Sequence, residues 1–291
     1  MLDLAGVYTA MITPFKNGEV DYEALRIQIE EQIAGNVAGL IPVGTTGESP
    51  TLDCKEHLKV IEKTVEFAAG RCQIIAGTGA NATGEAVELT LEAKKLGADA
   101  SLQVTPYYNK PTQEGLYRHF STVADKTGLP VVLYNVPGRA GVPIAVDTIA
   151  RLSGNPLMVA VKEAGGSVDR VSAIKDVCDI TVLSGDDSLT LPMISVGATG
   201  IISVASNVIP AELSKMVALA LEGNFKEAGK LHKQYYRFFC DLFIESNPIP
   251  VKAAMELVGK GKAEYRLPLC ELTPAHLEQL KATMKYCGIL N

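Results

Sequence analysis

Short apolar runs alternate with longer amphipathic stretches along the first three quarters of the chain. Eight runs are short, rich in β-branched residues and continuously apolar, which is typical of parallel strands covered on both faces. The runs are Gly6–Pro14, Gly39–Thr45, Gln73–Thr78, Ala98–Thr105, Pro130–Val136, Met158–Glu163, Ile180–Gly185 and Gly200–Ser206. Between them lie helical patterns such as Asp21–Ala34 and Thr83–Leu96, the second ending at Gly97. Eight successive β-α units predict an α/β fold of the TIM (β/α)8 barrel type.

The last quarter of the chain has no strand-like run. Its helical patterns are broken at Asn247-Pro248-Ile249-Pro250 and at Leu267-Pro268. We therefore expect a (β/α)8 catalytic barrel over residues 1–223 and a helical C-terminal domain over residues 224–291. A doubly wound sheet is the alternative architecture, and the absence of a GxGxxG motif argues against it.

Composition narrows the class of protein. Hydrophobic residues make up 47% of the chain and the formal net charge is −6, which argues against disorder and against nucleic acid as the main partner. No apolar run approaches the roughly 18 residues of a membrane span, and an acid stands where a secretory signal carries positive charge. The six cysteines are scattered, without a CxxC pair, as in a reduced cytoplasmic protein. The four histidines show no HExxH spacing, so we expect no metal site.

Lys162 stands out because it ends an apolar run of strand length, Met158–Val161. The chemistry of a TIM barrel lies at the carboxyl ends of its strands. Alternation places Lys162 on the same face as the small Ala160, which leaves room for a substrate. Removing an amine from water favours its neutral form, the nucleophile that attacks a carbonyl to form a Schiff base. The alternative is a lysine that reaches the rim or pairs with Glu163.

Three further features lie at predicted strand ends. Tyr134 can pass protons if its hydroxyl joins a chain of hydroxyls, although a lone buried tyrosine is commonly structural. Thr45-Thr46 lies between glycines that let the backbone turn tightly towards a carboxylate, or that form an ordinary turn. Arg139 suits a substrate carboxylate at the mouth of a site, or is simply solvated.

Together these segments resemble a known family. They are similar to the dihydrodipicolinate synthases, which belong to the Schiff-base lyases related to N-acetylneuraminate lyase. The segments that carry the resemblance are Gly6–Phe15, Gly44–Glu48, Tyr134–Arg139, Val161–Glu163, Ser184–Asp187 and Asn247–Lys252. The likeness covers essentially the whole chain, and the Thr-Thr pair with Arg139 favours the synthases over the neuraminate lyases.

The resemblance implies an enzyme of lysine and diaminopimelate biosynthesis that condenses pyruvate, as a Schiff base, with L-aspartate 4-semialdehyde. It implies no metal and no cofactor, and a homotetramer built as a dimer of tight dimers. The implied residues are Lys162 for the Schiff base; Tyr134, Thr45 and Tyr108 for a proton relay, with Tyr108 reaching across the tight dimer; Thr46 and Arg139 for the carboxylates of pyruvate and the semialdehyde; and Gly185 and Val204 for the pocket lining. The chain departs from the family pattern at Val204, where Ile is commoner, and at Ala140, where Thr is commoner.

The resemblance also implies a site for the inhibitor L-lysine at the tight-dimer interface. The matching residues are Ser49, His57, Asn81, Glu85 and Tyr107. If the resemblance is set aside, Glu85 is simply an acidic residue in the first turn of a helix, where the helix dipole favours a negative charge, and His57 is a solvated helix residue.

Three other functions stay open at this point. A sibling aldolase acting on a 2-keto-3-deoxy sugar acid or N-acetylneuraminate shares Lys162 and Tyr134, but Arg139 suits a short charged aldehyde better than a sugar. A non-catalytic amino-acid-sensing barrel does not require Lys162 or the tyrosines. A metal-dependent aldolase lacks ligands in the sequence.

Overall fold

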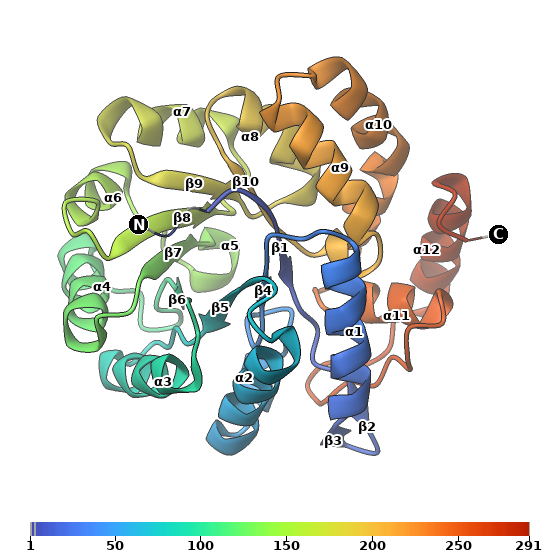
Figure 1. Cartoon of the computed structure of the whole chain (residues 1–291), viewed down its shortest axis with the longest axis horizontal. Helices are drawn as coiled ribbons and strands as arrows, with labels where there is room; N and C mark the ends of the chain where they lie inside the picture. Colours follow the sequence, from blue (N-terminus) through green and yellow to red (C-terminus); the bar gives the residue numbers. More distant parts are fainter. Residues whose placement is uncertain (1, 3, 291) are drawn as a thin grey trace.

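Eight parallel strands close into a barrel in the computed structural model, which describes residue 2 and residues 4–290 (Figure 1). The order around the barrel is β1-β10-β9-β8-β7-β6-β5-β4. The strands are β1 (Gly6–Ala10), β4 (Gly39–Ile41), β5 (Gln73–Gly77), β6 (Ala100–Val104), β7 (Val131–Asn135), β8 (Met158–Glu163), β9 (Thr181–Ser184) and β10 (Gly200–Ser203). The predicted TIM barrel is confirmed, and the doubly wound sheet is wrong because the first and last strands pair.

β1 and β4 each end four residues earlier than the sequence pattern predicts. β1 stops at Ala10 and β4 at Ile41. Val43 has a φ of 52°, which lies outside the extended region, so the chain leaves the sheet before Thr45. Thr45 therefore belongs to a loop that follows β4 and not to the strand itself.

Helices surround the strands (Figure 1). They are α1 (Tyr22–Ala34), α2 (Cys54–Ala68), α3 (Thr83–Leu96), α4 (Gln113–Thr127), α6 (Val146–Leu152), α7 (Val168–Val177), α8 (Thr190–Ser195) and α9 (Pro210–Leu221). Short elements decorate the loops: the hairpin β2 (Phe15–Lys16) and β3 (Glu19–Val20), the helix α5 (Pro137–Ala140), and the 3₁₀ turns η1 (Ser49–Thr51), η2 (Asp187–Leu189) and η3 (Ala205–Asn207). Among the residues that the structure describes, no helix is both long and apolar enough to cross a membrane.

Two helices begin or end at the capping residues that the sequence pattern predicts. Asp21 caps α1 by accepting a hydrogen bond from the backbone N–H of Ala24 at 3.0 Å. Gly97 ends α3 with a φ of 97°, which an L side chain rarely adopts. Both predicted boundaries are confirmed.

Residues of one strand alternate between two apolar clusters. On β7, Val132 and Tyr134 belong to the cluster inside the barrel, whereas Val131 and Leu133 pack against the helices. On β8, Ala160 faces the barrel interior. Alternation therefore places the next residue but one, Lys162, on the interior face as predicted.

The C-terminal part consists of α10 (Phe225–Asp241), α11 (Ile249–Leu257) and α12 (Pro274–Tyr286), which lie against one side of the barrel (Figure 1). Their buried residues Phe238, Met255 and Leu280 belong to the same apolar cluster as the outer faces of the strands. We propose that residues 1–223 form the barrel unit and residues 224–291 a helical domain that folds onto it and shares its core.

Candidate active site

A cavity of about 210 Å³ opens at the carboxyl ends of β4 to β7. Thr45, Tyr134 and Arg139 line it, and Ser49 and Tyr107 contribute to the same wall. The rest of the lining is mostly glycine and aliphatic. The cavity is thus small, largely apolar and furnished with a few polar groups, as sites for small ligands usually are.

The amine of Lys162 lies beside this cavity. Lys162 and Tyr134 are paired across β8 and β7, and the Lys162 Nζ lies 4.2 Å from the centroid of the Tyr134 ring. Both side chains are buried, with 6% and 7% of their surface exposed. Because Tyr134 lines the cavity, the amine sits next to the cavity wall and away from the rim. The reading of Lys162 as a rim lysine is therefore wrong.

The neighbouring carboxylate of Glu163 has other partners. It accepts hydrogen bonds from Asn135 Nδ2 at 2.7 Å, from the Gly165 N–H at 2.8 Å and from Arg170 Nε at 2.9 Å. Glu163 is fully buried on the outer face of β8, and Arg170 is the cation that neutralises it. The alternative pairing of Lys162 with Glu163 is wrong, because the two side chains leave the strand on opposite faces.

Two acids after β9 lie within electrostatic reach of Lys162. Burial raises the pKa of Asp186 to about 6, while the nearby Lys162 opposes that rise. Burial also raises the pKa of Asp187, which accepts hydrogen bonds from Ser203 Oγ at 2.5 Å and from the Val204 N–H at 3.1 Å. Sequence reasoning named this acidic pair as part of a segment and gave neither residue a role.

The loop that carries Thr45 and Thr46 depends on close backbone contacts. A Cβ at Gly47 would lie 2.9 Å from the Val43 Cα, and one at Gly77 would lie 2.6 Å from the Val43 carbonyl oxygen. Only glycine fits at either position, so the two glycines let the chain turn back towards the cavity. Thr45 then lines the cavity, while Thr46 is buried behind it with 3% of its surface exposed.

Glu48 ends this loop and ties it to the C-terminal domain. Its carboxylate forms an ion pair with Lys252 of α11, and both side chains are almost completely buried. Burial lowers the pKa of Lys252, although the charge of Glu48 acts in the opposite direction. The Lys252 Nζ also donates to the Glu264 carbonyl at 2.9 Å.

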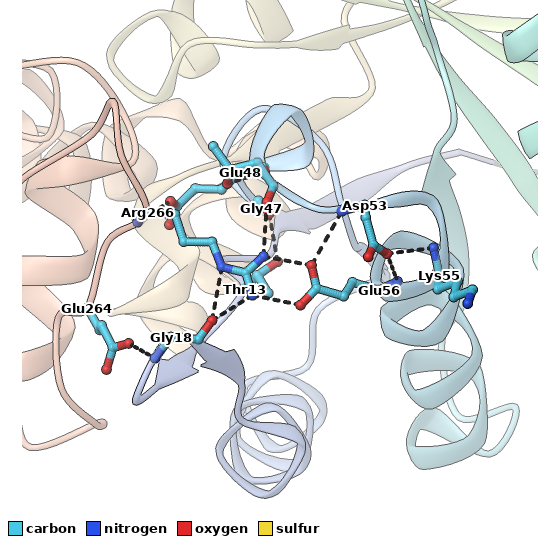
Figure 2. A network of polar contacts seen from close by, with 10 residues as sticks. Thr13, Gly18, Gly47, Glu48, Asp53, Lys55, Glu56, Glu264 and Arg266 are labelled. Carbon is cyan, nitrogen blue, oxygen red and sulfur yellow. Dashed lines mark hydrogen bonds and ion pairs between the residues drawn. The ribbon is translucent and has the colours of Figure 1, made fainter.

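Arg266 reinforces the same attachment (Figure 2). Its guanidinium binds the carboxylate of Glu56 through two hydrogen bonds of 2.7 Å and donates to the Gly18 carbonyl at 2.7 Å. Its backbone N–H donates to Glu48 Oε2 at 3.4 Å. Figure 2 shows the arginine between the β2–β3 hairpin, the loop at Gly47 and the start of α2. The loop is therefore held from behind by residues more than 200 positions away in the sequence.

Arg139 reaches the cavity from α5. Its side chain is exposed, and its Nη2 donates to the Asn247 carbonyl oxygen at 3.2 Å. The Asn247 side chain donates from Nδ2 to Thr46 Oγ1 at 3.0 Å. Sequence reasoning noticed Asn247 only as the start of a proline-rich segment and missed that it links these two predicted site residues.

Gly185 and Val204 lie at the carboxyl ends of β9 and β10, outside the lining of the cavity described above. The Gly185 N–H donates to the Glu163 carbonyl at 2.8 Å, and a Cβ at this position would lie 2.5 Å from the Ala164 Cβ. Val204 is buried, with its N–H held by Asp187. Their predicted contact with a substrate stays a prediction.

Tyr108 points away from the cavity of its own chain. It is 91% exposed, and its φ of 71° lies in the left-handed region. The adjacent Tyr107 turns the other way and lines the cavity; burial, and secondarily the nearby Glu85, raises its pKa. One chain by itself therefore brings Tyr134 and Thr45 to the cavity, but not the third hydroxyl of the predicted relay.

Three of the five residues predicted to bind lysine lie together at the cavity, whereas Glu85 lines a separate surface pocket and His57 is buried. Ser49 and Tyr107 line the cavity, and Asn81 Nδ2 donates to the Tyr107 carbonyl at 3.3 Å. His57 is buried behind this group, where its Nε2 lies 2.8 Å from the Gly77 carbonyl oxygen and burial lowers its pKa. The reading of His57 as a solvated helix residue is wrong.

In the part of the chain that the structure describes, no three His, Cys, Asp or Glu side chains lie close enough together to hold an ion.

Both the sequence and the fold are similar to those of known proteins. The profile described as the Dihydrodipicolinate synthetase family matches residues 3–287. This chain belongs to that family. A relative named 4-hydroxy-tetrahydrodipicolinate synthase, from Endomicrobium trichonymphae, is 50% identical over 98% of this chain and 99% of its own length.

Solved structures agree with this assignment. The chloride-inhibited dihydrodipicolinate synthase of Acinetobacter baumannii, complexed with pyruvate, superposes with a TM-score of 0.97 and 44% identity over 99% of this chain and 100% of that one. The enzyme of Cyanidioschyzon merolae, with lysine bound, superposes with a TM-score of 0.95 and 40% identity over 98% of this chain and 99% of that one.

Proposed function

We propose that this chain is a lyase, a 4-hydroxy-tetrahydrodipicolinate synthase, which condenses pyruvate with L-aspartate 4-semialdehyde in lysine and diaminopimelate biosynthesis. The observation that carries the proposal is the buried Lys162 amine, 4.2 Å from the centre of the Tyr134 ring at the carboxyl end of a barrel strand. The names of full-length relatives at about 50% identity favour this activity over the alternatives.

The chemistry follows from a reactive amine in an apolar pocket. The Lys162 amine attacks the carbonyl carbon of pyruvate, and water leaves as the imine forms. The imine nitrogen then withdraws electrons, so a proton leaves the methyl group and an enamine results. The enamine carbon attacks the aldehyde carbon of the semialdehyde, whose oxygen takes up a proton. The amino group of the adduct closes onto the imine carbon and releases the Lys162 amine.

Each of these steps moves a proton. We assign the transfers to the hydroxyl groups of Tyr134 and Thr45, which line one cavity, and to the Tyr108 hydroxyl of a neighbouring subunit. The exposure of Tyr108 and its left-handed backbone support a partner chain that covers it. A tight dimer, paired again into a homotetramer, supplies that partner.

The carboxylates of the two substrates need separate partners. We assign the pyruvate carboxylate to Thr46 and the semialdehyde carboxylate to Arg139, whose exposed guanidinium lines the mouth of the cavity. Gly185 and Val204 complete the pocket through backbone groups, which the nearby Asp187 helps to hold in place.

The other function classes have less support. A sibling aldolase that acts on sugar acids binds a larger, neutral aldehyde, whereas the charged Arg139 on the cavity lining suits a short charged aldehyde. A non-catalytic amino-acid-sensing barrel has no use for a buried lysine aligned with a tyrosine. A metal-dependent aldolase needs ligands, which the sequence does not suggest.

Feedback inhibition by L-lysine is the proposed regulation. Ser49 and Tyr107 line the cavity with a hydroxyl and a phenol, and the Asn81 amide bonds to the Tyr107 carbonyl. The Glu85 carboxylate is near enough to Tyr107 to raise its pKa, and a related enzyme binds lysine. His57 contacts the carbonyl oxygen of Gly77, which lines the same cavity. Titration of activity with L-lysine tests the proposal, and an unchanged rate at millimolar lysine would contradict it. Such a biosynthetic enzyme acts in the cytoplasm.

Reductive trapping tests the central assignment. The protein is incubated with pyruvate, reduced with borohydride and digested, and the adduct is located by peptide mass spectrometry. We expect one pyruvate-derived adduct, on Lys162, and none on this peptide in Lys162→Arg. Conversion of pyruvate with either aspartate semialdehyde or a sugar aldehyde then separates the synthase from a sibling aldolase. An adduct spread over surface lysines would remove the proposal.

A further inference from the structure

We infer that Asn247, which lies outside the barrel strands, is a positioning residue that fixes the direction of the Thr46 hydroxyl towards the pyruvate carboxylate. The inference rests on the proposed function and adds a residue to it. Asn247 begins the segment that leads into α11, and only 6% of its surface is exposed. It is the one described residue that hydrogen-bonds both Thr46 and Arg139.

The polarity of the hydrogen bond carries the argument. An amide nitrogen can only donate, so Thr46 Oγ1 must accept from Asn247 Nδ2 at 3.0 Å. The hydroxyl proton of Thr46 then has to point elsewhere. No acceptor for it is found among residue 2 and residues 4–290. The Thr46 hydroxyl is thus left as a donor, which is the role that a substrate carboxylate requires.

The cost of this arrangement points to function rather than stability. The Asn247 Oδ1 is buried and has no hydrogen-bond partner within the described chain. An unsatisfied buried carbonyl destabilises the folded state, and an apolar residue of similar size would avoid that cost. A residue kept only for packing has no reason to be an asparagine here.

The second contact of Asn247 gives an internal control. Arg139 Nη2 binds the backbone carbonyl oxygen of Asn247, which any side chain at this position retains. Replacing the Asn247 side chain therefore disturbs Thr46 directly and Arg139 only if the whole segment moves. If Asn247 positions Thr46, its replacement should affect pyruvate binding alone. If it only stabilises the segment, its replacement should affect the binding of both substrates.

The experiment is a double-mutant cycle between Asn247 and Thr46 in the full-length enzyme. We expect Asn247→Ala to raise the KM for pyruvate about three- to tenfold, the effect of one hydrogen bond, with less than a twofold change in the KM for aspartate semialdehyde. In a Thr46→Val background the same substitution should change the pyruvate KM less than twofold. Asn247→Asp, which keeps the size but accepts from the hydroxyl, should raise the pyruvate KM more than Asn247→Ala and replaces it if the alanine variant does not fold.

The outcomes separate the two proposals. Equal increases in both KM values, or an effect that persists in Thr46→Val, would mean that Asn247 is merely structural and would overturn the inference. A pyruvate KM unaffected by either substitution would overturn it as well. A wild-type protein that forms no adduct on Lys162 would instead overturn the proposed function and the inference with it.

Discussion

At the scale of single residues, burial decides which charges the site can hold. Burial raises the pKa of Asp186, and the charges of Asp187 and Glu163 raise it further, while the Lys162 amine and the Gly166 N–H act against them. Removal from water has the largest effect, so Asp186 holds its proton up to about pH 6. This residue therefore links the protonation of the site to the stability of the protein.

Asp186→Asn should make the protein more stable above about pH 6. The pKa of Asp186 is about 6 in the folded chain against 3.8 for the free group, so the folded state binds the proton more tightly. The ionised carboxylate then costs stability fully above pH 6, and this cost disappears as the pH falls below about 4. We expect a gain of up to about 3 kcal/mol at pH 8, measured by urea unfolding across this pH range.

The exposed Asp179, a few residues before β9, provides the matched control. Asp179→Asn should leave the difference in the free energy of unfolding between pH 4 and pH 8 the same as in the wild type. Equal stability of Asp186→Asn and the wild type at every pH would show that the Asp186 carboxylate is solvated.

At the scale of elements, the loop after β4 and the helix α11 depend on each other. The Glu48–Lys252 pair is buried on both sides, and Lys252 also lies 4.2 Å from the centroid of the Phe15 ring. A buried pair contributes little against an apolar substitute, but the loss of one partner leaves a charge without compensation. The pair is thus a point at which one substitution loosens the loop that carries Thr45 and Thr46.

Lys252→Met should destabilise the protein by about 3–5 kcal/mol, because it strands the Glu48 carboxylate in an apolar site. The double variant Glu48→Gln/Lys252→Met should recover most of that loss. Thermal and urea unfolding of the two single variants and the double variant measure the coupling. Simple addition of the two single effects would show that the pair does not interact. Lys95→Met removes an exposed ion pair with Glu92 and should cost less than about 1 kcal/mol.

At the scale of the whole molecule, the exposed position of Tyr108 supports our proposal that the active site is shared between two subunits. The Tyr108 side chain does not line the cavity of its own chain, whereas Tyr134 lines it and the Lys162 amine lies beside the Tyr134 ring. A second subunit that buries Tyr108 would both cover an exposed aromatic residue and supply the third hydroxyl. Under this proposal, the activity requires association of two subunits.

Co-expression of two inactive variants tests this idea. Lys162→Ala lacks the amine, and Tyr108→Phe lacks the hydroxyl that serves its neighbour. In a mixed dimer, the Lys162→Ala subunit lends its Tyr108 to the intact amine of the other subunit, so one site in two should recover. We expect about a quarter of wild-type activity from a statistical mixture, since half of the dimers are mixed. Activity no higher than that of the separate variants would show that Tyr108 does not cross between subunits.

The sequence by itself determined the barrel, the order of its units and the face on which Lys162 and Tyr134 lie. These follow from apolar runs and two-residue alternation, which are local and survive without knowledge of distant contacts. The tertiary structure decided what no spacing encodes: the pairing of Glu163 with Arg170, the burial of Glu48 against Lys252, and the contact between Thr46 and Asn247. Thr46 and Asn247 are 201 positions apart, and they meet because the C-terminal helices pack against the barrel next to the loop after β4.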